Sequence, residues 1–168
     1  KWGLIVFIVV IMIGTSFSVL FFGFSGTTER VKYNGISFEK RSNAWFAKIN
    51  GKTAAFTFLP EEVSGLNASR EAISRLVGKF EVDVTYDYNS TFKESIALAQ
   101  HQMGLTLAEY NIFVRKGFTM NNSYNIPIIK CSDSTENVPV VYFLSSNLTQ
   151  VGLEGNCIVA EARNEADV

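Results

Sequence analysis

Three carboxylates on one predicted strand are the residues of this chain best arranged for chemistry. In EVDVTYDY, residues 81–88, polar and apolar side chains alternate, which is typical of a β-strand. Glu81, Asp83 and Asp87 therefore share one face, where they could coordinate calcium or supply paired carboxylates for cleavage of a glycosidic bond. The solvent face of an amphipathic strand has the same pattern, and we favour that simpler interpretation.

The other patterns typical of catalysis are incomplete. His101 is the only histidine, which leaves a histidine-based zinc site unsupported, and no G-x-S-x-G motif supplies a nucleophile for a Ser–His–Asp triad. The GKT at residues 51–53 lacks the upstream glycine of a phosphate-binding loop. We predict no metal, no cofactor and no enzymatic activity. An exported hydrolase that uses the three carboxylates remains an alternative.

The two cysteines, Cys131 and Cys157, lie in short apolar runs that read as strands, IPIIKC and NCIVAEA. Their spacing of 26 positions excludes a CxxC redox motif, and two thiols are too few for a four-cysteine zinc site. In an oxidising compartment we expect the two to form a disulfide, which would bring the two strands close together. Two buried free thiols are the alternative.

Four Asn-X-Ser/Thr sequons are candidate glycosylation sites. They begin at Asn67, Asn89, Asn121 and Asn147, each beside a predicted turn or the end of a predicted element. Four is a mild excess over chance, and sequons are used only in glycosylating compartments. They therefore give modest support to an extracellular location.

An uncharged run, residues 2–24, decides where the protein resides. WGLIVFIVVIMIGTSFSVLFFGF has 23 residues, and a helix of this length crosses a hydrocarbon core of roughly 30 Å. A cleavable signal peptide has an apolar core of about 7–15 residues that ends in small residues. This run is longer and ends in Phe21, Phe22 and Phe24. We therefore predict a retained single-pass transmembrane helix over residues 1–24.

A pilin-like helix is the main alternative for the same run. In such a subunit the helix sits in the membrane and later packs into the core of a filament. Ile5 stands where a bacterial-type pilin usually carries glutamate, which leaves the archaeal type. The small residues Gly14, Ser16 and Ser18 could let a second helix approach closely. Because Lys1 marks the cytoplasmic side, we place residues 25–168 outside the cell membrane.

Beyond the run, a tether is predicted over 25–35 and one extracytoplasmic domain over 36–168. Residues 25–168 hold 14 basic and 16 acidic side chains with no basic patch, which argues against nucleic acid as a partner. The predicted partners are the lipid bilayer and other membrane or envelope proteins, including copies of this chain.

Periodicity in this domain predicts strands and two helices. Asn50-Gly51 predicts a type I′ hairpin between AWFAKI and KTAAFTF, and PEE at 60–62 resembles the first turn of a helix. A helix is predicted over 69–79, with an apolar stripe of Ile73, Leu76, Val77 and Phe80.

A second helix is predicted to open at a Thr91–Glu94 capping box and to end near Met103 or Tyr110, with Gly104 as a possible break. Strands follow in NIFVRKGFTM, IPIIKC, VPVVYFLS and NCIVAEA. VPVVYFL is almost entirely apolar and predicts a central strand. The order of elements predicts an α+β fold, in which a mixed sheet with two helices follows the transmembrane helix.

Three segments together resemble a known group of proteins. They are YNGISFEK with AWFAKINGKTAAFTFLPEEV, then VTYDYNSTFKESIALAQ, and finally VPVVYF with GNCIV. They are similar to uncharacterised archaeal proteins that have one N-terminal transmembrane helix and a small exported domain. The resemblance implies an extracytoplasmic location and a disulfide, and it implies no activity. The leading hypothesis is a structural or interaction role in a cell-envelope or membrane assembly.

Overall fold

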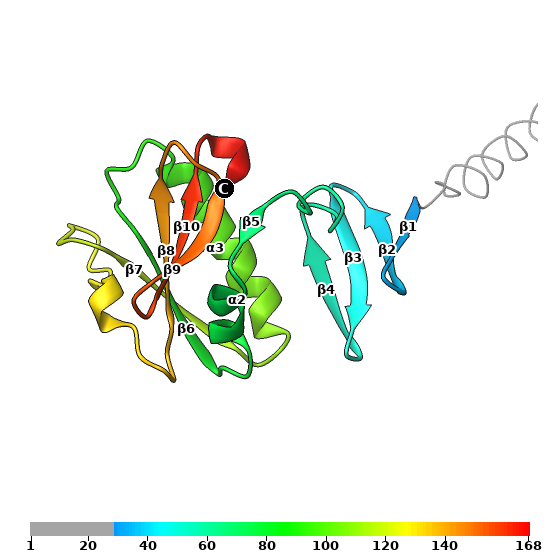
Figure 1. Cartoon of the computed structure of the whole chain (residues 1–168), viewed down its shortest axis with the longest axis horizontal. Coiled ribbons are helices and arrows are strands. Elements are labelled where there is room, and N and C mark those ends of the chain that lie inside the picture. The colour runs from blue at the N-terminus through cyan, green and yellow to red at the C-terminus, as the bar shows by residue number, and fades with distance from the viewer. Residues whose placement is uncertain (1–28) are drawn as a thin grey trace, which may run out of the picture.

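The computed structural model describes residues 29–168, which form a four-stranded and a six-stranded sheet joined by residues 57–66 (Figure 1). The predicted α+β class, with two helices and a mixed sheet, is confirmed. The predicted transmembrane helix lies outside the described residues. Within residues 29–168, no helix is long and apolar enough to cross a membrane.

The four-stranded sheet is antiparallel, with the strands side by side in chain order. Asn50 and Gly51 both have positive φ, which confirms the predicted type I′ turn. Asn34-Gly35 forms the same kind of turn between the first two strands, two hairpins earlier. The prediction of a tether over 25–35 is therefore wrong in its second half, where a strand begins at Arg30. The strands are β1 (Arg30–Tyr33), β2 (Ile36–Arg41), β3 (Ala44–Ile49) and β4 (Lys52–Phe56).

One face of this small sheet carries its core. Phe38, Trp45 and Ala47 are buried there, and the Phe38 ring meets the Phe56 ring edge to face at 5.8 Å. The other face carries charges, including Glu39, which forms ion pairs with two arginines. The alternation of apolar and charged residues thus gives the sheet one apolar, packed face and one charged, solvent-exposed face.

The six-stranded sheet has the order β5-β9-β10-β8-β6-β7. β6, β7, β8 and β10 run parallel, and β9 runs antiparallel to β10. β8 lies between β10 and β6, so the predicted central position of VPVVYFL is confirmed. The strands are β5 (Asn67–Ala68), β6 (Glu81–Tyr86), β7 (Phe113–Phe118), β8 (Val140–Ser145), β9 (Gln150–Glu154) and β10 (Cys157–Ala162).

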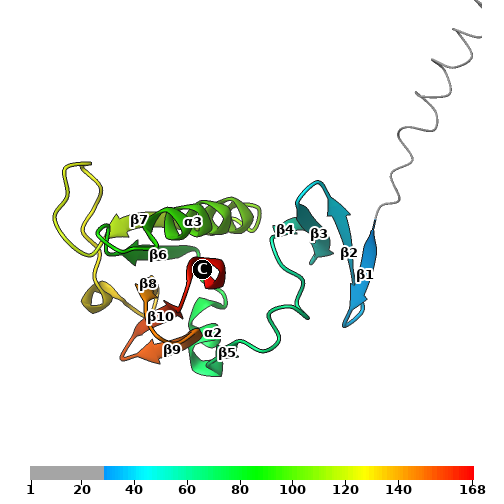
Figure 2. The same cartoon turned by 90° about the horizontal axis from the view of Figure 1, so that it is seen from above.

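Both helices cover the face of this sheet that is turned toward the four-stranded sheet (Figure 2). α3 (Lys93–Ala108) continues through Gly104, and it buries Ile96 and Gln100. The predicted capping box at Thr91 and Glu94 does not form. At the start of the helix the N–H of Phe92 donates to the hydroxyl of Ser90, and Thr91 accepts no capping bond.

α2 (Arg70–Leu76) is shorter than predicted, and its apolar stripe is different. Ala72 and Leu76 pack on the sheet, whereas Ile73, Val77 and Phe80 are exposed. The physical reason is that the chain leaves the helix at Val77, whose backbone is extended, and turns at Gly78, where φ is +72°.

The crossover from β7 to β8, residues 119–139, covers the opposite face of the sheet (Figure 2). The chain moves outward from β6 to β7 and then back past β6 to β8. Crossovers between parallel strands are almost always right-handed, and two right-handed crossovers that run in opposite directions along a sheet must lie on opposite faces of it.

The segment IPIIKC within this crossover makes a single bridge, Phe118–Ile128, rather than the predicted strand. PEE at 60–62 forms a turn rather than a helix.

Close packing holds the crossover against the sheet. A Cβ atom added to Gly117 would lie 2.6 Å from two side-chain carbons of Ile129, so a larger residue there would force Ile129 to move. The buried hydroxyl of Thr85 donates a hydrogen bond of 2.8 Å to the carbonyl of Ile129. The outer face of β6 is therefore a second core rather than a solvent face.

Candidate functional site

The two carboxylates of β6, Glu81 and Asp83, and Asp87 just after the strand form no acid–base pair. Asp83 is 1% exposed, and Arg115 on β7 donates to both of its oxygens, from Nε at 2.7 Å and from Nη2 at 2.6 Å. Glu81 lies 3.7 Å from the same guanidinium, and Asp87 accepts a hydrogen bond from the backbone of Asn89. Our expectation of a solvent face is wrong for Asp83, because the crossover covers it.

This arrangement is that of a structural ion pair. The Asp83 carboxylate raises the pKa of the Arg115 guanidinium above its ordinary value through its hydrogen bonds. The guanidinium takes one lone pair of each Asp83 oxygen, and burial leaves the remaining lone pairs inaccessible to a substrate or a metal from solution. The geometry therefore lends no support to hydrolysis by Glu81, Asp83 and Asp87. His101 lies exposed on α3.

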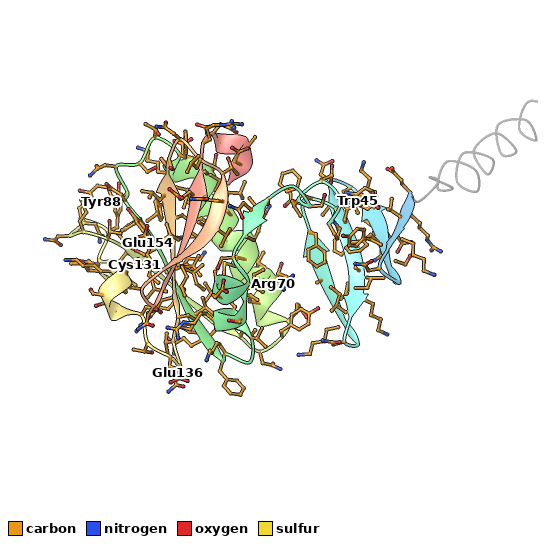
Figure 3. The ribbon with its side chains drawn as sticks, viewed as in Figure 1. Trp45, Arg70, Tyr88, Cys131, Glu136 and Glu154 are labelled. Atoms are coloured by element: carbon orange, nitrogen blue, oxygen red, sulfur yellow. A yellow bond between two sulfur atoms is a disulfide. The ribbon has the colours of Figure 1, made fainter. Side chains whose placement is uncertain are left out.

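The predicted disulfide between Cys131 and Cys157 is confirmed. It joins a short 3-10 turn, η1 (Cys131–Asp133), to the first residue of β10. Figure 3 shows Cys131 on the side of the molecule far from Trp45 and the four-stranded sheet. The bond thus fastens the crossover to the sheet, and nearby the hydroxyl of Ser134 donates to the carbonyl of Asn156 at 2.7 Å.

An apolar cleft of about 620 Å³ lies between the two sheets, on the helical face of the larger one. Val82 of β6 and Ile112 form its floor, and α2 and α3 contribute Leu76, Met103 and Leu107. The remaining apolar lining comes from the linker, from β4, from α3 and from the C-terminal turn: Ala55, Phe56, Phe58, Val63, Leu98, Ala99, Ala166 and Val168. A cavity of this size falls within the usual range for ligand pockets, about 300–1,000 Å³.

A few polar groups line the same cleft. Thr57 donates to Gln102 at 3.0 Å, and Thr106 donates to the carbonyl of Ala55 at 3.3 Å. These bonds attach β4 and the linker to α3. Among the described lining residues, Glu165 alone is charged. The cleft can therefore accept apolar groups and one neighbouring positive charge.

Sequence reasoning did not find this cleft. Phe58 was assigned to a strand, but β4 ends at Phe56, and Phe58 lies 48% exposed at the cleft. Leu98 on α3 is 58% exposed beside it, and none of the features predicted for that helix involves Leu98. The only available signal was that Phe58 and Leu98 are apolar residues outside any predicted apolar stripe. The sequence does not show that these two residues lie near each other.

No family model, curated protein or solved structure matches this chain. Its resemblance to archaeal membrane-anchored proteins therefore remains an expectation.

Proposed function

We propose that this chain is a single-pass membrane protein whose residues 29–168 form an extracytoplasmic binding module. In this proposal the module acts through contacts with another membrane or envelope protein. The uncharged run at residues 2–24 supports the anchor. The disulfide supports the location, because such bonds persist in oxidising compartments and are rare in the cytosol.

The apolar cleft carries the proposal of a binding role. Its exposed rim residues, Phe58, Val63 and Leu98, present apolar surface to solvent without a partner in the described chain. We assign to it an apolar segment of a protein partner, with a basic residue near Glu165. A protein segment fits this role because the cleft combines hydrophobic walls with several hydroxyl and amide groups at its rim.

Leu98 and Leu105 provide a matched test on one helix. They are 58% and 60% exposed, yet only Leu98 lines the cleft. A photo-crosslinking amino acid would be placed at each position in turn in the full chain, in native membranes. We expect a discrete adduct from position 98 that is absent from position 105. Equal adducts at both positions, or none at 98, would contradict the assignment of the cleft.

Leu98→Glu and Leu105→Glu extend the same comparison. The first should abolish recovery of the crosslinked partner in a pull-down, because a charge in the cleft loses its hydration without a counterion. The second should leave recovery unchanged.

Protease treatment of intact cells tests the location separately. An extracytoplasmic domain should be digested by protease added outside the cells.

A further inference from the structure

All four sequons lie at one edge of the six-stranded sheet. Asn89 follows β6, Asn121 follows β7 and Asn147 follows β8, which places them beyond the carboxyl ends of three parallel strands. Asn67 pairs with Gln150, and Gln150 pairs with Glu161 near the carboxyl end of β10. The fourth asparagine therefore belongs to the same edge, which we call the carboxyl edge.

Figure 3 gives a landmark for each edge. Tyr88, beside Asn89, lies at the upper left, and Glu136, which precedes β8, lies at the bottom. Because the sequons stand at four different strands of the order β5-β9-β10-β8-β6-β7, the four positions are spread along the carboxyl edge rather than gathered at one point. Four bulky groups can therefore be accommodated there.

The side chains at this edge are accessible. All four sequon asparagines are exposed. Asn122, next to Asn121 but outside any sequon, differs: its side chain is bonded to the backbone of Tyr124 and Ile126. Asn121 is thus the free member of the pair, and it is the one that a transferase could reach.

Asparagines outside sequons are found elsewhere in the molecule as well as near the carboxyl edge. The chain has 13 asparagines, and Asn111, Asn137 and Asn156 lie at the opposite, amino edge. None of these three begins a sequon. The three asparagines of the four-stranded sheet, at 34, 43 and 50, also lie outside sequons. Sequons therefore occur at one edge although asparagine itself is spread over the molecule.

We propose that Asn67, Asn89, Asn121 and Asn147 carry N-linked oligosaccharides that cover the carboxyl edge. In each transfer the amide nitrogen attacks the anomeric carbon of a lipid-linked oligosaccharyl phosphate. The carbon–nitrogen bond forms, the carbon–oxygen bond to phosphate breaks, the amide loses one proton, and the lipid phosphate leaves with the electron pair. This proposal rests on the extracytoplasmic location proposed above.

The glycan coat has a consequence for binding. The carboxyl ends of parallel strands are the usual ligand-binding edge of an α/β sheet. Oligosaccharides at this edge would exclude a protein partner from it. The part of the apolar cleft lined by Val82, Leu107 and Ile112 lies away from the carboxyl edge, so the coat directs partners to that part of the cleft.

The test uses the full chain purified from its native membranes. Intact-mass measurement should find a chain heavier than its sequence, and the variants Thr91→Ala, Ser123→Ala and Thr149→Ala should each remove the mass of one glycan. The hydroxyl-keeping variants Thr91→Ser, Ser123→Thr and Thr149→Ser are matched controls and should retain it. At the fourth site Asn67→Gln is preferred, because Ser69 caps α2 and its loss would also weaken the helix.

A chain of unmodified mass from native membranes would overturn the glycan coat. Alkylation of the same sample keeps this result separate from the location. Unmodified mass with both thiols oxidised refutes the coat and leaves the extracytoplasmic module standing. Unmodified mass with two free thiols refutes both. Modification at only one sequon also overturns the proposal, because one glycan does not cover the edge.

Discussion

Replacing Arg115 with methionine should destabilise this protein far more than a comparable change at the surface. Asp83 is 1% exposed, and both of its carboxylate oxygens accept hydrogen bonds from Arg115. Without the guanidinium, a buried carboxylate is left with no counterion. Removal of one partner from a fully buried ion pair costs about 3–5 kcal/mol, and because Arg115 is half exposed the loss here should lie at the lower end of that range.

The reverse change should cost less. In Asp83→Asn, the arginine side chain is already 50% exposed and can turn to water. The remaining cost is that of an imperfectly bonded buried amide, about 1–3 kcal/mol. The double variant Asp83→Leu with Arg115→Met should recover most of the loss, because no uncompensated charge remains in the core.

The chain offers a surface pair with the same donor atoms as a control. Arg41 bonds Glu39 through Nε at 3.2 Å and Nη2 at 2.6 Å, but Arg41 is 63% exposed. Because water replaces the lost contacts, Arg41→Met should leave the free energy of unfolding nearly unchanged. Glu39 also keeps its ion pair with Arg30, so the comparison of the two arginines contrasts a buried carboxylate that loses its guanidinium with a partly exposed one that retains a counterion.

Urea titration of the full chain in mild detergent, followed by far-ultraviolet circular dichroism, measures these changes. The expected order of destabilisation is Arg115→Met, then Asp83→Asn, then Arg41→Met. If Arg115→Met costs no more than Arg41→Met, Asp83 is not buried as described, and the crossover does not cover this face.

Three further predictions concern Gly117, the disulfide and Tyr86. Gly117→Ala should cost about 1–3 kcal/mol, because the new methyl overlaps Ile129, and Ile129→Ala should relieve part of that loss in urea titrations. Replacing both Cys131 and Cys157 with serine should cost about 3–4 kcal/mol, since the bond closes a loop of 26 residues, and differential scanning calorimetry of the oxidised chain and the variant measures the loss. Burial raises the pKa of Tyr86, so the neutral phenol favours the folded state. Stability from this group should be present below about pH 10 and lost as the pH rises further, and Tyr86→Phe should flatten that decline.

Each of these predictions has an outcome that contradicts it. Neutral behaviour of Gly117→Ala would mean that Ile129 does not pack on the strand. Unchanged thermal stability of the serine variant would remove the disulfide from the forces that hold the crossover. A steeper alkaline loss in Tyr86→Phe than in the parent chain would show that the phenol is not the group that burial perturbs.

Local patterns predicted much of the secondary structure. The alternation in EVDVTYDY placed β6 correctly, and Asn50-Gly51 placed a hairpin at the right residues. Such signals work because a strand's side-chain period and a type I′ turn depend on neighbouring residues. Asn34-Gly35 carried the same turn signal, and using it would have revealed β1.

Other predictions failed where distant contacts decide the outcome. The stripe expected on the first helix was wrong, because Gly78 ends the helix region and leaves Val77 and Phe80 in solvent. IPIIKC was expected to form a strand, but its Ile129 packs over Gly117 within the crossover. Apolar residues show that a segment is buried, and they do not show against which partner.

The order of residues is enough to establish which side chains of β6 share a face, where the cysteines and sequons stand, and which run is long enough to span a bilayer. Only the folded chain shows that Asp83 is buried, that the cysteines meet, that four sequons share one edge, and that a cleft opens beside α3. The reason is that periodicity depends on neighbouring residues. Burial depends on which face each crossover covers, and strand order depends on pairing between segments far apart in the chain.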